Sequence, residues 1–313
     1  MWAYLIRRIL ETIPVMLIVA VLVFMMLRLA PGDPASIIAG DAATSADIAQ
    51  IRESLGLDEP IVKQFFIWMG NMATGDFGES FAYKRTVDSL VLERIEPTLA
   101  LATLTIIMAC VIAVPLGTLA AYRQGSWTDR LVMGMSVVGF SVPVFVIGYI
   151  LIYVFSVKLG WFPVQGYQRI SEGFGGFIHR LILPATALSV IFIALIARMT
   201  RTSVMEVLNE DYVRTARAKG LSEFRVLVQH ALRNAAVPIV TVIGIAIAVL
   251  IGGVVVTESV FAIPGLGSLT VDAVLSRDYP TVQAVILLFS FAYVLINLAI
   301  DLIYTIVDPR IRY

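Results

Sequence analysis

Six long apolar runs constrain the fold of this chain more than any other feature. An α-helix needs roughly 20 apolar residues to cross a hydrocarbon layer about 30 Å thick. With 15% charged residues and a mean hydropathy of +0.89, the 313 residues carry more apolar surface than a soluble core could bury. We therefore expect a single all-α, polytopic membrane domain over residues 1–313, with six spans at about 9–30, 98–122, 131–157, 181–199, 236–257 and 282–307.

The first run resembles a signal peptide because two arginines precede it. Its apolar stretch is longer than that of an ordinary signal peptide, and no A-x-A site follows, so we interpret it as an uncleaved span.

Lys and Arg residues beside the spans predict the orientation, because cytoplasmic loops carry an excess of them. Thirteen lie on the side of the N-terminus: Arg7, Arg8, Arg123, Arg130, Arg198, Arg201, Arg214, Arg217, Lys219, Arg225, Arg233, Arg310 and Arg312. The short loops on the other side hold four: Lys158, Arg169, Arg180 and Arg277. The count omits 31–96, because loops this long translocate largely regardless of charge. It predicts cytoplasmic termini, a cytoplasmic loop at 200–235 and an extracytoplasmic segment at 31–96.

The outer segment contains a predicted helix after Pro60. Its apolar residues recur at helical spacing at Ile61, Phe65, Met69 and Met72. Two interpretations stay open for this apolar face. It either caps the outer ends of the spans or forms a docking surface for an outside partner.

The cytoplasmic loop has the pattern of two helices joined at a glycine. The sequence favours a helix from Thr202 to Lys219, a break at Gly220 and a second helix from Ser222. The second helix would present one apolar stripe, formed by Phe224, Val228, Ala231 and Leu232. Such a pair of helices either lies in the membrane interface or presents itself to another protein.

Several function classes are disfavoured by what the sequence lacks. It contains no G-x-x-x-x-G-K-[ST] phosphate loop. A net charge of zero and a pI near 6.7 give no reason to expect nucleic-acid binding. Cys110 is the single cysteine, so we expect neither an internal disulfide nor a cysteine-rich metal site. Asp301 is the only carboxylate well inside a predicted span, which disfavours a proton relay.

An intramembrane hydrolase is the enzyme alternative, and it would need a base at the depth of its nucleophile. The two histidines, His179 and His230, are predicted just outside the fourth span and in the cytoplasmic loop. The serines inside spans are Ser136, Ser141 and Ser290. We therefore expect no catalytic residue in this chain.

The loop sequence "EDYVRTARAKGLSEFRVLVQHALRNAAVP", from Glu210 to Pro238, resembles the cytoplasmic loop of bacterial binding-protein-dependent ABC transporter permeases. The dipeptide, oligopeptide and nickel branch, first-permease type, fits best. Similar motifs are "LAPGDPA", "LGLDEPIVKQFFIW", "GDFGES", "ESVFAIPGLGSL", "RDYP" and "DPRIRY". The loop departs from the general permease pattern, because the positions of its Glu-Ala-Ala triplet hold Arg214, Thr215 and Ala216. This form resembles the peptide-branch variant.

The resemblance implies a type I ABC importer permease fold in the bacterial cytoplasmic (inner) membrane. It also implies three kinds of partner: a second homologous permease, two cytoplasmic ATPase subunits that hold ATP and Mg, and an extracytoplasmic substrate-binding protein. This chain itself would bind no cofactor or metal. The implied substrates are dipeptides or oligopeptides, with glutathione or nickel as alternatives. An autonomous secondary carrier is the other function class.

The resemblance assigns ATPase coupling to the loop residues Arg214, Thr215, Ala216, Arg217, Lys219, Gly220, Leu221, Ser222 and Phe224. Apolar anchors dominate interfaces, so Leu221 and Phe224 are the best candidates for contact. The basic side chains either meet acidic groups of the ATPase or simply follow the positive-inside rule.

Two further sets of residues bear on assembly and on the pathway. Gly244, Ala248 and Gly252 form a small-residue face in the fifth span, which serves either packing within the chain or the seam between permeases. Prolines inside spans kink helices and free carbonyl groups that can line a wet cavity. The candidates for this role are Pro115, Pro143 and Pro184.

Overall fold

The computed structural model of the chain describes residues 2–29, 35–36, 44–54 and 56–307. Parts of the predicted outer segment and residues 308–313, with Arg310 and Arg312, lie outside them. The described part is helical, with one isolated bridge between Glu79 and Thr86 and no β-strand, which confirms the all-α class. It divides into two compact units, Met1–Ile95 with Leu269–Val294 and Glu96–Ser268 with Leu295–Tyr313, which we describe separately.

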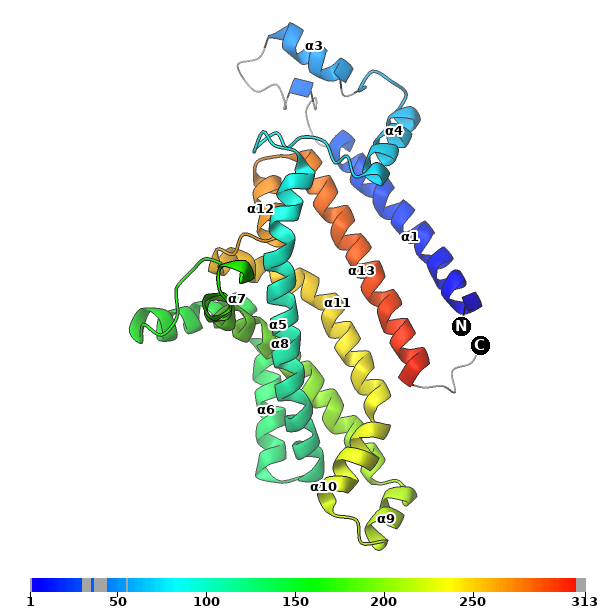
Figure 1. Cartoon of the computed structure of the whole chain (residues 1–313), viewed down its shortest axis with the longest axis vertical. Helices are drawn as coiled ribbons and strands as arrows, with labels where there is room; N and C mark the ends of the chain where they lie inside the picture. The colour runs from blue at the N-terminus through cyan, green and yellow to red at the C-terminus, as the bar shows by residue number, and fades with distance from the viewer. Residues whose placement is uncertain (1, 30–34, 37–43, 55, 308–313) are drawn as a thin grey trace. The chain divides into compact units, whose positions relative to one another are not determined.

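Within the described residues, four helices are long and apolar enough to cross a membrane (Figure 1): α5 (Val87–Tyr122), α8 (Phe174–Leu208), α11 (Ala236–Phe261) and α13 (Tyr279–Val307). Helix α1 (Trp2–Leu29) covers the predicted first span and contains the apolar stretch Leu10–Met26. At 36 and 35 residues, α5 and α8 are each about 50 Å long, so they extend beyond the hydrocarbon layer. Both exceed their predicted spans because polar residues at their ends continue the helix.

The sequence predicts a third span at 131–157 that kinks at Pro143, and in the structure the helix is broken there. Helix α6 (Trp127–Ser141) is followed by α7 (Val144–Leu151), which continues as a π-helix, Ile152–Lys158, and the two directions differ by 102°. Pro143 causes the break. It has no N–H to donate, and it holds Val142 in an extended conformation, with φ −95° and ψ 121°.

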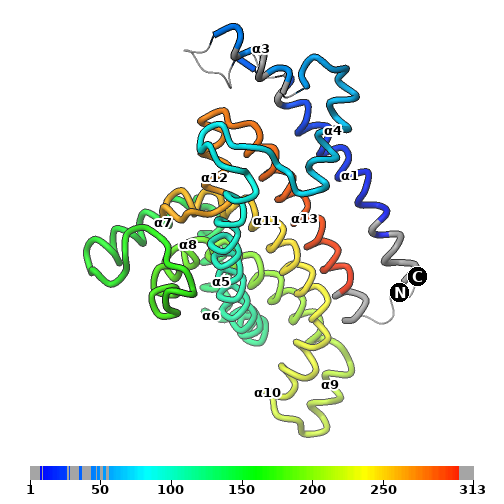
Figure 2. The backbone as a smooth tube through the Cα atoms, turned by 45° about the horizontal axis from the view of Figure 1, so that its top comes forward, coloured from blue at the N-terminus to red at the C-terminus, as the bar shows by residue number. Residues whose placement is uncertain are grey.

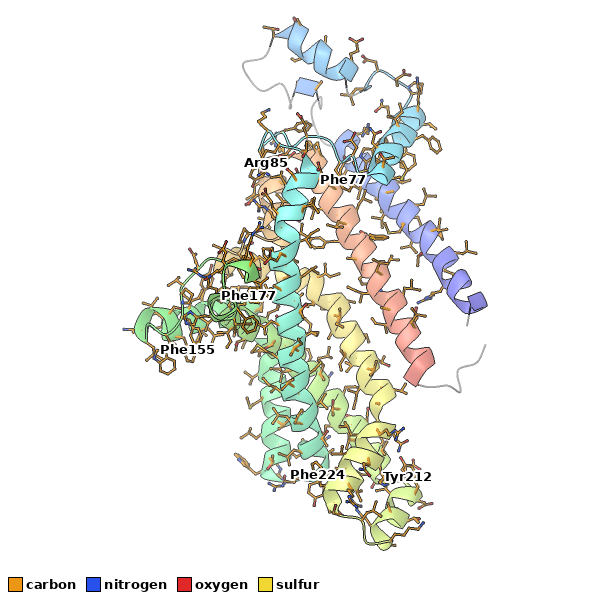
Figure 3. The ribbon with its side chains drawn as sticks, in the orientation of Figure 1. Phe77, Arg85, Phe155, Phe177, Tyr212 and Phe224 are labelled. Atoms are coloured by element: carbon orange, nitrogen blue, oxygen red, sulfur yellow. The ribbon has the colours of Figure 1, made fainter. Side chains whose placement is uncertain are left out.

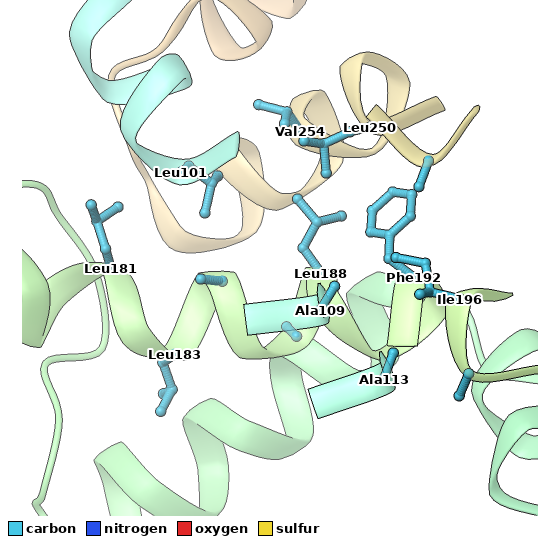
Figure 4. Close-up of a cluster of buried hydrophobic side chains, with 14 of the residues drawn as sticks. Leu101, Ala109, Ala113, Leu181, Leu183, Leu188, Phe192, Ile196, Leu250 and Val254 are labelled. Carbon is cyan, nitrogen blue, oxygen red and sulfur yellow. The ribbon is translucent and has the colours of Figure 1, made fainter. Parts of the chain in front are cut away.

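The core of the second unit is built around α8. In its apolar window 61% of the residues are buried, against 22% for α5 and 33% for α11. Figure 4 shows Leu188 and Phe192 of α8 among Leu101, Leu250 and Val254 from α5 and α11. Lipid is as apolar as leucine, so close packing holds membrane helices together. At Gly117 of α5 a Cβ atom would lie 2.5 Å from the Ala197 carbonyl oxygen, so only glycine permits this approach.

In the first unit, α4 (Ile61–Thr74) lies against α1. The rings of Phe65 and Trp68 contact Phe24, and Arg28 donates a 2.6 Å hydrogen bond to Gln64. Phe65 therefore faces the protein, as a cap on the spans requires, whereas Ile61 is 47% exposed. The second interpretation, a docking surface, stays a prediction for the exposed side of α4. Helix α3 (Ser45–Ser54) precedes it.

A buried carboxylate joins two of the sequence motifs in this unit. Asp278, of "RDYP", is fully buried just before α13. It accepts hydrogen bonds from the Ser80 hydroxyl of "GDFGES", from the backbone N–H of Phe81 at 3.1 Å and from the Thr281 hydroxyl at 2.7 Å. Three donors compensate the cost of burying this group.

Candidate functional site

The loop between α8 and α11 is a helical hairpin (Figures 1 and 2). Helix α9 (Asp211–Ala218) is joined through Gly220 to α10 (Glu223–Arg225), which continues as a π-helix, Val226–Leu232. The corner is a Schellman motif, because Leu221 N–H donates to Ala216 C=O and Gly220 N–H donates to Arg217 C=O. Gly220 has φ +80°, a conformation that side chains strain. The helix therefore ends where the sequence predicts.

Two details of the predicted loop are wrong. The expected helix from Thr202 to Lys219 is divided, because α8 continues to Leu208 and α9 starts after Glu210. The expected stripe is not one face, since Phe224 and Val228 are exposed whereas Ala231 is fully buried. The π-helix has a wider turn than an α-helix, so residues spaced for an α-helical face diverge.

The hairpin is fixed to the ends of three spans. Val213 of α9 and Val226 of the π-helix are fully buried. Ala231 belongs to a cluster with Ala121 of α5, Val204 of α8 and Ile239 of α11. Close-packed interiors deform little, so the loop and these helix ends form one continuous packed body.

The outer surface of the hairpin combines an apolar knob with paired charges. Phe224 is 75% exposed and points away from the hairpin beside the corner (Figure 3). Arg217 spans the corner and donates to both oxygens of Glu223, at 3.1 and 3.3 Å, while Arg214 donates to Asp211 at 3.1 Å. Exposed pairs of this kind contribute at most about 1 kcal/mol.

The predicted coupling residues differ in exposure. Thr215, Lys219, Gly220 and Ser222 are exposed, and Leu221 is half-buried. Ala216 is only 7% exposed, so it supports the loop from inside. Tyr212 is 43% exposed, and partial burial together with the Glu210 carboxylate raises the pKa of its phenol, which therefore stays neutral.

An ion pair between α6 and α8 was not predicted. Arg201 donates to Asp129 through Nη2 at 2.8 Å, and the two side chains are 20% and 6% exposed. Asp129 also accepts from Gly125 N–H at 2.9 Å. Both residues lie just outside the predicted spans. The signal that could have indicated the pair is a carboxylate at the end of one predicted span and an arginine at the end of another.

A second residue that sequence reasoning missed is Glu258, fully buried near the end of α11. It accepts hydrogen bonds from the Thr98 hydroxyl at 2.5 Å and from Ser268 N–H at 2.8 Å. The Thr98 oxygen also accepts from Leu266 N–H at 2.8 Å, at the start of α12 (Leu266–Leu275). A Cβ on Gly265 would lie 2.1 Å from the Glu258 carboxylate, which accounts for the glycine in "ESVFAIPGLGSL".

The small-residue triplet of α11 does not share one environment. Gly244 is buried, and a Cβ there would lie 2.7 Å from Ile300 Cδ1 of α13. Ala248 is half-buried, whereas Gly252 is exposed with nothing within 4 Å of its Cβ position. Gly244 therefore serves packing within the chain, and a role in a permease seam stays a prediction for Gly252.

The three prolines also differ. Helices α5 and α8 continue through Pro115 and Pro184, and Pro143 stands at the break between α6 and α7. Pro115 and Pro143 are exposed, whereas Pro184 is buried. Their place along a pathway stays a prediction. The serines of the hydrolase alternative donate to carbonyls of their own helices, and His179 lies inside α8 and contacts the Trp161 carbonyl oxygen at 2.8 Å.

Long apolar helices, one of them broken, and a structured hairpin anchored on three of them define a multi-pass α-helical membrane protein. Residues 113–313 match the family described as binding-protein-dependent transport system inner membrane component. Residues 1–102 match the corresponding N-terminal family. The chain belongs to this family of transport-system membrane components.

Relatives and solved structures agree with this assignment. The chain is 53% identical, over the full length of both proteins, to the probable peptide ABC transporter permease protein y4tP of Sinorhizobium fredii. It is 45% identical to the glutathione transport system permease protein GsiC of Escherichia coli, over 99% of each chain. The fold is similar to that in an inward-facing structure of the MetNI methionine ABC transporter, with a TM-score of 0.58 over 70% of this chain and 96% of that chain at 21% identity.

Proposed function

We propose that this chain is one of two permease subunits of an ATP-driven importer in the bacterial cytoplasmic membrane. It would form half of a translocation pathway for peptides delivered by an extracytoplasmic binding protein, with both termini in the cytoplasm. Two separate ATPase subunits would bind ATP and Mg. Family membership and the permease names of the relatives support this proposal.

The observation that carries the coupling role is the contrast between the two faces of the hairpin. Its inner face is fixed by buried Val213 and Val226, while its corner exposes Phe224 beside Gly220. A rigid knob on a rigid support suits insertion into a groove of another protein, since little ordering is required on binding. We infer that the ATPase accepts Phe224 and Leu221, and that its motion reaches α8 and α11 through the packed cluster.

The internal ion pairs bear on the basic residues of the loop. Arg214 and Arg217 are held by Asp211 and Glu223 of the same hairpin. To contact carboxylates of the ATPase, these arginines would first have to release Asp211 and Glu223. The apolar corner is therefore the better candidate for contact energy.

Peptides are the proposed substrate class because the relatives support them. One is named a probable peptide permease and another a glutathione permease, and glutathione is itself a tripeptide derivative. Glutathione import is the second candidate on this ground. Nickel import rests on the sequence resemblance alone.

The proposal is tested by reconstituting the complete transporter in vesicles and measuring ATP-dependent peptide uptake. Phe224→Ala should lower uptake and weaken retention of the ATPase subunits during purification. Phe174→Ala is the matched control, because Phe174 is also an exposed phenylalanine, 65% exposed, but lies at the opposite end of α8 from the hairpin. Equal ATPase retention in the two variants would contradict the docking role. Uptake by vesicles that contain this chain alone would establish an autonomous carrier instead.

A further inference from the structure

An apolar groove runs along α6 in the second unit, from the first turn of the helix to the corner with α7. Its volume is about 640 Å³, within the range of about 300–1,000 Å³ that is typical of small-molecule sites. Leu131, Met135 and Val138 of α6 contribute one wall, and all three are between 46% and 65% exposed. The groove is therefore uncovered in this chain.

A glycine opens the groove. At Gly134 a Cβ atom would meet nothing within 4 Å, so the space beside it belongs to the groove. Gly139, one and a half turns later, instead permits a close approach to α8, with Ala194 Cβ at 3.2 Å from its Cβ position. A larger side chain at Gly134 would extend into the groove.

The mouth of the groove has polar chemistry. Trp127, 76% exposed, and Arg130 lie there on the first turn of α6. The neighbouring Asp129 is engaged by Arg201, while the Arg130 side chain is exposed and attracts Asp129 electrostatically at longer range. Tryptophan is enriched at the level of lipid headgroups, so this end of α6 combines an interfacial anchor with an exposed cation.

Helix α6, which lines the groove, is shorter than a full membrane crossing. Helix α6 has 15 residues and is therefore about 22 Å long. The hydrocarbon layer of one leaflet is about 15 Å deep, which is half of the membrane core. At the inner end α7 turns away by 102° and closes the groove with Ile147 and Ile150. A membrane-crossing helix of a partner would need the full depth of about 30 Å, whereas one acyl chain needs only this half.

We propose that this groove binds an anionic phospholipid, with one acyl chain along α6 and the phosphate against Arg130 and Trp127. In the proposed orientation the mouth faces the cytoplasmic leaflet, where anionic lipids attract basic side chains. The lipid fills the angle between α6 and α7, so the anionic lipid content of the membrane bears on the stability of this corner.

The test uses the intact transporter in phosphatidylcholine vesicles with a photoactivatable phosphatidylglycerol whose reactive group lies at mid-chain. The matching phosphatidylcholine probe is used in parallel, and cross-linked peptides are located by mass spectrometry. We expect residues 134–138 to be labelled about fivefold more by the anionic probe, the preference that one cation near the surface provides.

Variants separate the headgroup from the chain. Arg130→Gln should remove the preference for the anionic probe, whereas Arg123→Gln should keep it, because Arg123 is exposed in the loop before α6 but does not line the groove. Gly134→Leu should reduce labelling by both probes. If the Gly134→Leu transporter does not assemble, the comparison of the two arginine variants decides whether the headgroup binds at Arg130. Equal labelling by both probes, or no labelling because a partner subunit covers the groove, would overturn the proposal.

Discussion

Arg201 of α8 donates hydrogen bonds to both carboxylate oxygens of Asp129 of α6, with Nε 2.5 Å from Oδ1 and Nη2 2.8 Å from Oδ2. A planar guanidinium that binds both oxygens of a carboxylate fixes the relative orientation of two helices as well as their separation. The pair lies on the same stretch of α8 as Val204, which supports the hairpin. It therefore holds α6 in register with the helix that carries the loop.

Loss of this pair should destabilise the chain. Asp129→Asn leaves the Arg201 charge without its counterpart, at a cost of about 2 kcal/mol, between the values of exposed and of fully buried pairs. The measurement is a double-mutant cycle of thermal unfolding with Asp129→Asn, Arg201→Gln and the double variant. We expect the double variant to lose less than the sum of the single losses. Additive losses would show that the two side chains are not coupled.

Gly220 should tolerate asparagine and reject valine. A β-branched residue at φ +80° costs about 1–2 kcal/mol, whereas asparagine adopts left-handed conformations more readily. No neighbour lies within 4 Å of the Cβ position, so the effect reports backbone strain alone. Amide hydrogen exchange at Gly220 and Leu221 should accelerate in Gly220→Val, and peptide uptake should fall. Equal behaviour of the two variants would contradict the role of the left-handed corner.

The hydroxyl of Thr98 should contribute more to the stability of the protein than its methyl group does. Thr98→Val keeps the shape but removes the donor to Glu258 and the acceptor for Leu266 N–H, at a cost of about 1–3 kcal/mol. Thr98→Ser keeps both hydrogen bonds and is the matched control. Thermal unfolding of the purified transporter distinguishes the variants. A loss in Thr98→Ser as large as that in Thr98→Val would assign the effect to packing.

Gly252→Leu should impair assembly rather than folding. The Cβ position of Gly252 faces open space in this chain, so the Cβ atom of a leucine meets no neighbour of its own chain. If Gly252 lies in the seam between permeases, the second permease should no longer copurify, while membrane insertion persists. Normal copurification in Gly252→Leu would remove Gly252 from the seam.

Hydropathy averages over many residues, so the sequence locates the long apolar helices α5, α8, α11 and α13, and it predicts the end of α9 because Gly220 is a local signal. It does not predict the direction of the chain after Val142. An apolar window treats α6 and α7 as one span, although the backbone at Pro143 cannot continue the helix. The predicted kink at Pro143 is thus a complete break.

The polar centres were beyond sequence reasoning for a different reason. The Glu258 carboxylate accepts hydrogen bonds from Thr98, which is far away in the sequence, and from Ser268, which lies beyond the turn after α11. Neither partner is visible in the local sequence pattern. The predicted fifth span also ended at residue 257, one position before Glu258. The apolar stripe of the loop was predicted from the 3.6-residue period of an α-helix. The π-helix has a different number of residues per turn, so the predicted residues do not share one face.

The buried valines of the hairpin have a consequence for how force would travel through the molecule. Val213 and Val226 are fully buried, and protein interiors have low compressibility. A displacement imposed on the corner at Gly220 cannot be absorbed by local compression. It is passed on to the helix ends that carry Val204 and Ile239, which pack against Ala231 of the hairpin.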